Sequence, residues 1–114
     1  MELQDSEREN NIRLIKLTDR LDIVGKGEIE TKFADYCSGE KARVIVDLSD
    51  VDLLASIGIR LLTITARSVV SLGGKMVLLN PIPDVQSVLE ITGIPAIIPI
   101  YSYLESAETV LLSP

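Results

Sequence analysis

The sequence has no histidine, no tryptophan and only one cysteine, Cys37, among its 114 residues. Histidine is the commonest general base and the commonest metal ligand in proteins, so its absence argues against acid–base catalysis and against a metal site. A single cysteine cannot form an internal disulfide and is too few for a structural zinc site. We therefore expect no metal, no cofactor and no catalytic centre, with Cys37 on the buried side of a helix.

Long hydrophobic runs are also missing. The first 20 residues are charged and lack a central apolar stretch, so we expect no secretory signal. The longest uncharged stretch, residues 91–104, holds two prolines and is shorter than the ~18 apolar residues of a membrane helix. We expect a cytoplasmic protein without membrane insertion.

Positive charge is scarce, since 17 acidic residues outweigh 11 basic ones and the formal net charge is −6. An acidic surface repels phosphate backbones, so we expect no nucleic-acid partner. The excess acid either suits a basic protein partner or serves solubility alone.

Short apolar runs alternate with segments of helical periodicity along the chain. The patterns predict strands over 11–17, 43–48, 75–79 and 96–100, and helices over 27–37, 56–72, 83–92 and 102–112. The first ten residues are expected to be frayed or to form a weak edge strand, and 18–22 to form a turn and loop. Strand–helix alternation predicts one α/β domain over 1–114, with about four helices on a mixed, mostly parallel sheet of four to five strands.

Ser56 stands between a predicted strand and a predicted helix, where an N-cap residue belongs. Its hydroxyl would accept a hydrogen bond from a backbone N–H of the first turn. The same position favours a phosphate, because unpaired N–H groups and the helix dipole both attract anions there. Two interpretations stay open: a plain helix cap, or a phosphate acceptor. Ser102, with Glu105 three residues later, predicts a capping box for the last helix.

The helix after Ser56 is apolar over more of its circumference than one buried face requires. Beside the core stripe runs a second stripe, formed by Ile57, Arg60, Ile64, Arg67 and Ser71. Either a partner or a loop of the same chain would cover such a surface. Arg60 and Arg67 would then meet acidic groups of the partner, or form a solvated rim.

The segment VIVDLSDVDLLASIGIRLL, followed by GGKMVLL, resembles the STAS domain of bacterial anti-sigma-factor antagonists. Members of that family have a strand ending in an Asp-Leu-Ser type sequence, a short loop reading Asp-Ser-Ser/Thr-Gly, and then a helix. The resemblance runs from about residue 11 to residue 112, and the order and length of the elements agree. It implies a single STAS-like domain.

The resemblance implies a protein-binding module and not an enzyme. In the family, the partner anti-sigma factor is a serine kinase that phosphorylates the serine after the loop aspartate, a position that falls on Ser56. Phosphorylation releases the partner, a phosphatase restores binding, and free antagonist captures the anti-sigma factor so that the sigma factor can act in transcription. The family's glycine falls on Gly58.

This chain departs from the family pattern at two positions. Ala55 stands in place of the aspartate and Ile57 in place of the second Ser/Thr. Both departures favour an alternative function, a non-phosphorylated STAS scaffold subunit of a transporter or sensory complex.

The residues expected to contact a partner come from three segments. The first is the loop that in the family often reads Gly-Glu-Leu-Asp, for which an ordinary turn is the alternative here. The second is the start of the Ser56 helix, and the third is that helix's outer stripe. Together they are Arg20, Leu21, Asp22, Leu54, Ala55, Ser56, Ile57, Gly58, Arg60, Ile64 and Arg67.

Overall fold

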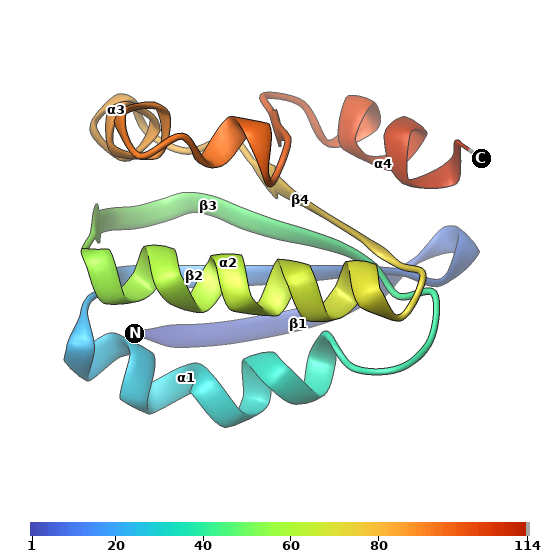
Figure 1. Cartoon of the computed structure of the whole chain (residues 1–114), viewed down its shortest axis with the longest axis horizontal. Helices are drawn as coiled ribbons and strands as arrows, with labels where there is room; N and C mark the ends of the chain where they lie inside the picture. The colour runs from blue at the N-terminus through green and yellow to red at the C-terminus, as the bar shows by residue number, and fades with distance from the viewer. Residues whose placement is uncertain (114) are drawn as a thin grey trace.

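The structure is a computed structural model that describes residues 1–113. Within this range five strands form one sheet, with helices packed against it (Figure 1). In chain order the elements are β1 (Glu2–Arg8), the 3-10 turn η1 (Glu9–Asn11), β2 (Ile12–Leu21), α1 (Ile23–Tyr36), β3 (Arg43–Leu54), α2 (Ser56–Ser71), β4 (Lys75–Leu79), α3 (Pro83–Ile91), the 3-10 turn η2 (Ile94–Ala96), β5 (Ile100–Tyr101) and α4 (Leu104–Leu112).

The strand order across the sheet is β1-β2-β3-β4-β5. The pair β1–β2 is an antiparallel hairpin, whereas the pairs β2–β3, β3–β4 and β4–β5 are parallel. The predicted α/β class with a mixed, mostly parallel sheet is confirmed. Because β2 and β3 run in parallel, their carboxyl ends lie side by side, with Leu21 opposite Leu54.

Alternation along the central strands creates two cores of unequal size. On one face of the sheet, Val44, Val46 and Leu48 of β3 pack in a large core that includes buried side chains of α1, α2 and α3. On the other face, Ile45 packs in a smaller core that includes Ala107 of α4. Three helices therefore cover one face, and α4 covers part of the other.

The first predicted helix and two of the predicted strands are longer than expected. Strand β2 continues to Leu21 and β3 to Leu54, so 18–21 is paired strand and not a loop. Helix α1 begins at Ile23, four residues before the predicted start. The first turn was not predicted because it contains Gly25 and is followed by Gly27, and glycine is a poor helix former.

The C-terminal prediction was wrong in two details. Residues 96–100 are not one strand: the chain makes the turn η2 and then the two-residue strand β5. Pro99 lacks an N–H for the sheet, although its carbonyl accepts a hydrogen bond from Leu78 N–H at 2.9 Å. Ser102 does not cap α4, whose N-cap is Tyr103 without a capping side-chain bond.

At the other end of the chain, one of the two alternatives for the first ten residues is confirmed. They form the edge strand β1 over Glu2–Arg8 and the start of η1. Charged side chains along β1 disfavour pairing of its open edge with other chains.

Candidate functional site

The candidate site lies at the end of the sheet where β2 and β3 finish and α1 and α2 begin. We call this end, formed by residues 20–24 and 53–60, the Ser56 pole. The strand register places Arg20 beside Leu53 and Leu21 beside Leu54. The Ala55 N–H donates a hydrogen bond of 3.0 Å to the Leu21 carbonyl, which ties the start of α2 to the end of β2. The two predicted segments, 20–22 and 54–58, are therefore brought together.

The floor of the pole is closely packed. A Cβ at Gly58 would lie 2.7 Å from the Leu21 carbonyl oxygen and 2.5 Å from Leu21 Cγ, so only glycine lets α2 approach β2 this closely. The side chains of Leu21 and Leu54 are buried in the core. Among the predicted contact residues, these three support the surface from below and do not project from it.

Ser56 is not the N-cap of α2, contrary to the sequence prediction. The N-cap is Ala55, with extended φ/ψ of −89° and 166° and no side-chain capping bond. The reason is the length of β3: the strand runs to Leu54, so Ala55 alone links it to the helix. Ser56 is the first residue of α2 and is exposed, and its hydroxyl has no capping role.

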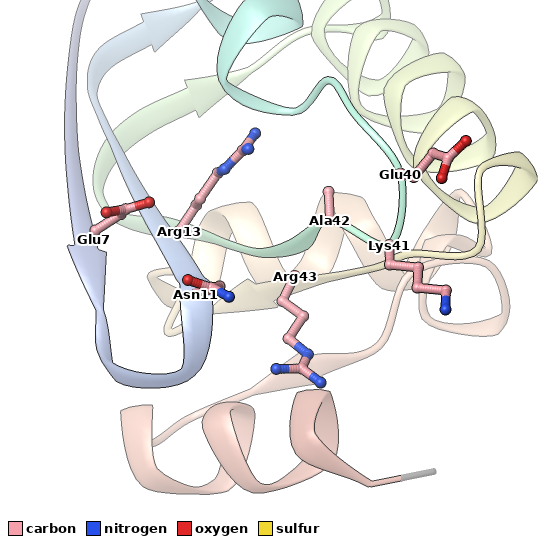
Figure 2. Close-up of a pocket in the computed structure, with 7 residues that line it drawn as sticks. All are labelled: Glu7, Asn11, Arg13, Glu40, Lys41, Ala42 and Arg43. Atoms are coloured by element: carbon pink, nitrogen blue, oxygen red, sulfur yellow. The ribbon is translucent and has the colours of Figure 1, made fainter.

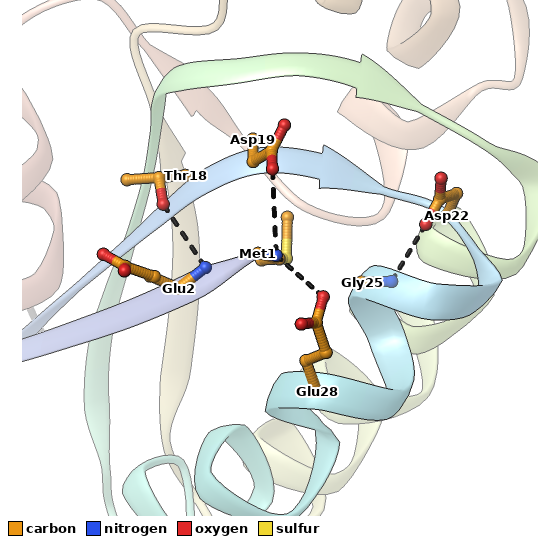
Figure 3. A network of polar contacts seen from close by, with 7 residues as sticks. All are labelled: Met1, Glu2, Thr18, Asp19, Asp22, Gly25 and Glu28. Carbon is orange, nitrogen blue, oxygen red and sulfur yellow. Dashed lines mark hydrogen bonds and ion pairs between the residues drawn. The ribbon is translucent and has the colours of Figure 1, made fainter.

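Asp22 has a structural role beside Ser56. It is the N-cap of α1, and its Oδ1 accepts a hydrogen bond of 2.9 Å from the Gly25 N–H (Figure 3). A Cβ at Gly25 would collide with the Arg20 carbonyl oxygen, so this turn also requires glycine. Half-buried Asp22 thus fixes the direction in which α1 leaves the pole.

The amino end of β1 braces α1 further along. The Met1 nitrogen lies 2.8 Å from Glu28 Oε1 and 4.0 Å from Asp19 Oδ2. The Glu2 N–H donates to Oγ1 of Thr18 at 3.3 Å, and Thr18 precedes Asp19 in β2 (Figure 3). These contacts join β1, β2 and α1 behind the pole.

Three exposed apolar residues of the pole were not predicted from the sequence. Ile23 and Val24, in the first turn of α1, are 70% and 67% exposed, and Leu53 near the end of β3 is also exposed. The buried stripe of α1 consists of Gly25, Ile29 and Phe33. Ile23 and Val24 lie outside this stripe, and that spacing is the sequence signal that could have identified them as exposed. Because the helix was expected to begin at residue 27, Ile23 and Val24 fell outside it, and helical spacing could not be used to predict their exposure.

The Ser56 pole holds these apolar side chains, two exposed arginines and the half-buried carboxylate of Asp22. Ala55 and Ile57 are half-buried, whereas Arg20 and Arg60 are exposed. Arg60 is one helical turn after Ser56, and residues four apart are neighbours on a helix surface.

Apart from half-buried Ile57, the outer stripe of α2 is open to solvent. Ile64 and Arg67 are exposed, so no loop within residues 1–113 covers this face. Neither Arg60 nor Arg67 takes part in an ion pair in that part of the chain. Of the two alternatives for this face, intramolecular cover is therefore wrong.

A hollow of about 370 Å³ lies away from the pole, near the amino ends of β2 and β3 (Figure 2). Arg13 Nη1 donates to the carbonyls of Tyr36 and Ser38, at 2.6 and 2.9 Å. Arg43 Nη1 donates to the Asn10 carbonyl at 2.8 Å. Figure 2 shows Arg13 and Arg43 pointing to opposite sides. These arginines tie turns to the sheet and do not converge on a ligand.

The described residues hold neither a cluster of metal ligands nor a membrane-spanning helix. Residues 1–113 contain no group of three or more side chains placed to hold a metal ion. Over the same residues no helix has the length and apolar character needed to cross a bilayer.

Comparison with known proteins identifies the family. The model of the STAS domain matches residues 4–107. BtrV of Bordetella bronchiseptica, named as a proposed anti-sigma factor antagonist, is 30% identical over 80 residues, which are 70% of this chain and 69% of BtrV.

Solved structures agree on the fold. The STAS domain protein of Planctomyces limnophilus, described as an anti-sigma-factor antagonist, superposes with a TM-score of 0.86 at 21% identity, over 97% of this chain and 98% of that one. The anti-sigma factor antagonist SpoIIAA superposes in its unphosphorylated form with a TM-score of 0.75 at 20% identity, over 96% of each chain. The phosphorylated form, from Bacillus, gives 0.69 at 20% identity, over 96% of this chain and 99% of that one. The family match and these folds agree: the chain belongs to the STAS domain family.

Proposed function

We propose that this protein is an anti-sigma-factor antagonist that captures an anti-sigma factor at the Ser56 pole. The observation that carries the proposal is an exposed serine at the first position of α2, at the same end of the sheet as the exposed apolar side chains of Ile23, Val24 and Leu53, in a STAS domain. The names of BtrV and SpoIIAA support this class of partner. On this proposal the protein is a cytoplasmic binding module without catalytic activity of its own.

The switch that we propose is electrostatic. The anti-sigma factor, acting as a serine kinase, phosphorylates Ser56 and adds about −1.5 to −2 charges to a surface rich in apolar side chains. The free-energy cost of burying that charge against the partner would exceed the stabilisation from the apolar contacts, so the complex dissociates. A phosphatase restores the binding form. That SpoIIAA is known in a phosphorylated form supports this part of the proposal.

The start of α2 is suited to carry a phosphate. Ala55 has no side-chain acceptor, and its carbonyl accepts from the Gly58 and Ile59 N–H groups at 2.9 and 3.1 Å. The N–H groups of Ser56 and Ile57 are therefore the ones that remain available to an anion. The helix dipole and exposed Arg60 add favourable charge on the same side.

The proposal is tested by incubating the full chain with the cognate anti-sigma factor and ATP, followed by intact mass and peptide mapping. We expect the mass of one phosphate on Ser56 and none on a Ser56→Ala variant. Ser56→Asp should weaken binding of the anti-sigma factor, whereas Ser68→Asp, an exposed serine of the same helix, should not. No phosphate at Ser56, together with normal binding by Ser56→Asp, would rule out the switch.

A second candidate function follows from Ala55 and Ile57. If these residues have removed the kinase recognition sequence, the domain is an unswitched scaffold subunit of a transporter or sensory complex. A double variant, Ala55→Asp with Ile57→Ser, restores the family's loop sequence. Phosphorylation of the double variant but not of the natural chain would show that the natural module is unswitched. Failure of the natural chain to bind the anti-sigma factor would then favour the scaffold function.

A further inference from the structure

A groove runs between α2 and the segment that follows η2, away from Ser56. Helix α2 lies on the outside of the sheet, between α1 and the segment containing α3 and η2 (Figure 1). The groove has a volume of about 320 Å³ and is lined by Ala66, Arg67, Val70, Ser71 and Ile97. Val70 is 61% exposed and Ile97 is 45% exposed, so two large apolar side chains face solvent across it. Within residues 1–113 nothing packs over them.

The charge at this groove is opposite to that of the rest of the protein. The chain has a net charge of −6, yet α2 carries Arg60 and Arg67 and no acidic residue. Arg8, Lys16 and Lys26 are each paired with a carboxylate, to Glu108, Asp50 and Glu30. Arg67 has no such partner in the described residues, although it lines the groove and is exposed.

We propose that this groove binds an amphipathic helix of a partner protein, with acidic residues along the border of the helix's apolar face. Apolar residues at i and i+4 of that helix would pack against Val70 and Ile97, and a Glu or Asp would pair with Arg67. Val70 lies 14 residues after Ser56, about 21 Å along the helix axis, so this surface is distinct from the proposed switch.

Charge also selects among possible occupants. Two copies of a chain with a net charge of −6 repel each other, which disfavours a groove-to-groove dimer. The same net charge disfavours an anionic lipid surface. A helix with acidic borders is attracted to Arg67 without needing the whole protein to be basic.

The test uses two synthetic helical peptides with the same leucine pattern, one with Glu and one with Lys at the flanking positions. Each is titrated into the isotopically labelled full chain and followed by amide chemical shifts. We expect the Glu peptide to shift the amides of Ala66, Arg67, Val70 and Ile97 and to bind about tenfold more tightly than the Lys peptide. No anti-sigma factor is present, so the result is independent of the function proposed above.

Two variants of the groove and one control variant test whether Arg67 and Val70 make the proposed contacts. Arg67→Glu should reverse the preference between the two peptides, and Val70→Asp should weaken both. Lys32→Glu, a charge reversal of an exposed residue of α1, should leave both affinities unchanged. Because Arg67, Val70 and Lys32 are exposed, all three variants should unfold near the natural midpoint, which thermal melts will check.

Four outcomes would overturn the proposal. Equal binding of both peptides, or a preference that Arg67→Glu does not reverse, would remove the charge argument. Shifts confined to other surfaces would remove the groove. Concentration-dependent dimers in sedimentation that Val70→Asp converts to monomers would assign the groove to a second copy of the chain instead.

Discussion

Helices α1 and α2 begin side by side at the Ser56 pole, but their first turns are held in different ways. Helix α1 has a side-chain cap, in which Asp22 accepts a hydrogen bond from the Gly25 N–H. Helix α2 has none, since its N-cap is Ala55. Each start depends on a glycine that lets the backbone approach β2, Gly25 in α1 and Gly58 in α2.

The difference shows how one end of a sheet can separate support from function. The capped start of α1 is satisfied within the chain and offers no N–H at Gly25 to a ligand. At the uncapped start of α2 the Gly58 N–H donates to the Ala55 carbonyl at 2.9 Å, but the Ser56 and Ile57 N–H groups remain available next to an exposed serine hydroxyl. A phosphate on Ser56 would meet these groups, whereas a phosphate near α1 would compete with the Asp22 carboxylate.

If α1 is held firmly along its whole length, its far end should stay closed, and Cys37, the C-cap of α1, reports on that end. Burial raises the pKa of this thiol from 9.0 to about 12. At pH 8 its reaction with a disulfide reagent should be about 10³-fold slower in the folded chain than in guanidinium, because the thiolate is the reactive form. Rapid labelling under native conditions would show that the end of α1 opens.

The same pKa gives a sign for the pH dependence of stability. The folded state keeps the Cys37 proton up to about pH 12, whereas the unfolded thiol loses it above pH 9.0. This contribution to the free energy of unfolding is therefore complete below pH 9.0 and is lost as the pH rises toward 12. A Cys37→Ala variant should lack this part of the alkaline loss.

The largest mutational effect is expected at Gly58. Gly58→Ala should lower the free energy of unfolding by about 3 kcal/mol, because the new Cβ meets the Leu21 carbonyl and side chain. The matched control is Gly27→Ala in α1, where a Cβ meets nothing within 4 Å. That change should stabilise by about 0.5–1 kcal/mol through helix propensity. Chemical denaturation measures both, and equal effects at the two glycines would contradict the close approach of α2 to β2.

Removing the cap of α1 should have a smaller effect. Asp22→Ala should cost about 1 kcal/mol in denaturant unfolding, through loss of the bond to Gly25 N–H. Asp22→Asn keeps an acceptor oxygen and should cost less than half as much. If the alanine variant were as stable as the natural chain, both helix starts would be effectively uncapped.

The smallest effect is expected from giving α2 the cap that it lacks. Ala55→Asp should raise the free energy of unfolding by about 0.5–1 kcal/mol, because its carboxylate can accept from the first-turn N–H groups that the Ala55 carbonyl leaves free, and it interacts well with the dipole. Thermal and denaturant unfolding measure the gain, with Asp52→Asn as a nearby charge control. A loss of stability would mean that those N–H groups are already engaged.

Several features of the fold could be predicted from residues alone. The runs at 43–48 and 75–79 are apolar enough to require a buried strand, and both are strands in the structure. The stripe containing Leu62, Ala66 and Val69 predicted the buried face of α2. Ser56 was correctly placed at the strand-to-helix junction, because a change of periodicity marks that point.

Other features depended on contacts that no local pattern records. Strands β2 and β3 are both longer than predicted because their ends pair, with Arg20 opposite Leu53. Neither segment shows regular alternation of apolar and polar residues there. That pairing moved the start of α2 so that Ala55, and not Ser56, became the N-cap. It also buried Leu21 and Leu54 and left Ile23 and Val24 exposed.

By itself, the sequence determined the class of fold, the core stripes and the resemblance that led to Ser56, because periodicity and residue type are local properties. The tertiary structure alone decided which of the candidate residues reach solvent, how each helix begins, and that Arg67, Val70 and Ile97 share a groove. The physical reason is that exposure and capping depend on which strands pair and how far, and strand pairing joins residues distant in the chain.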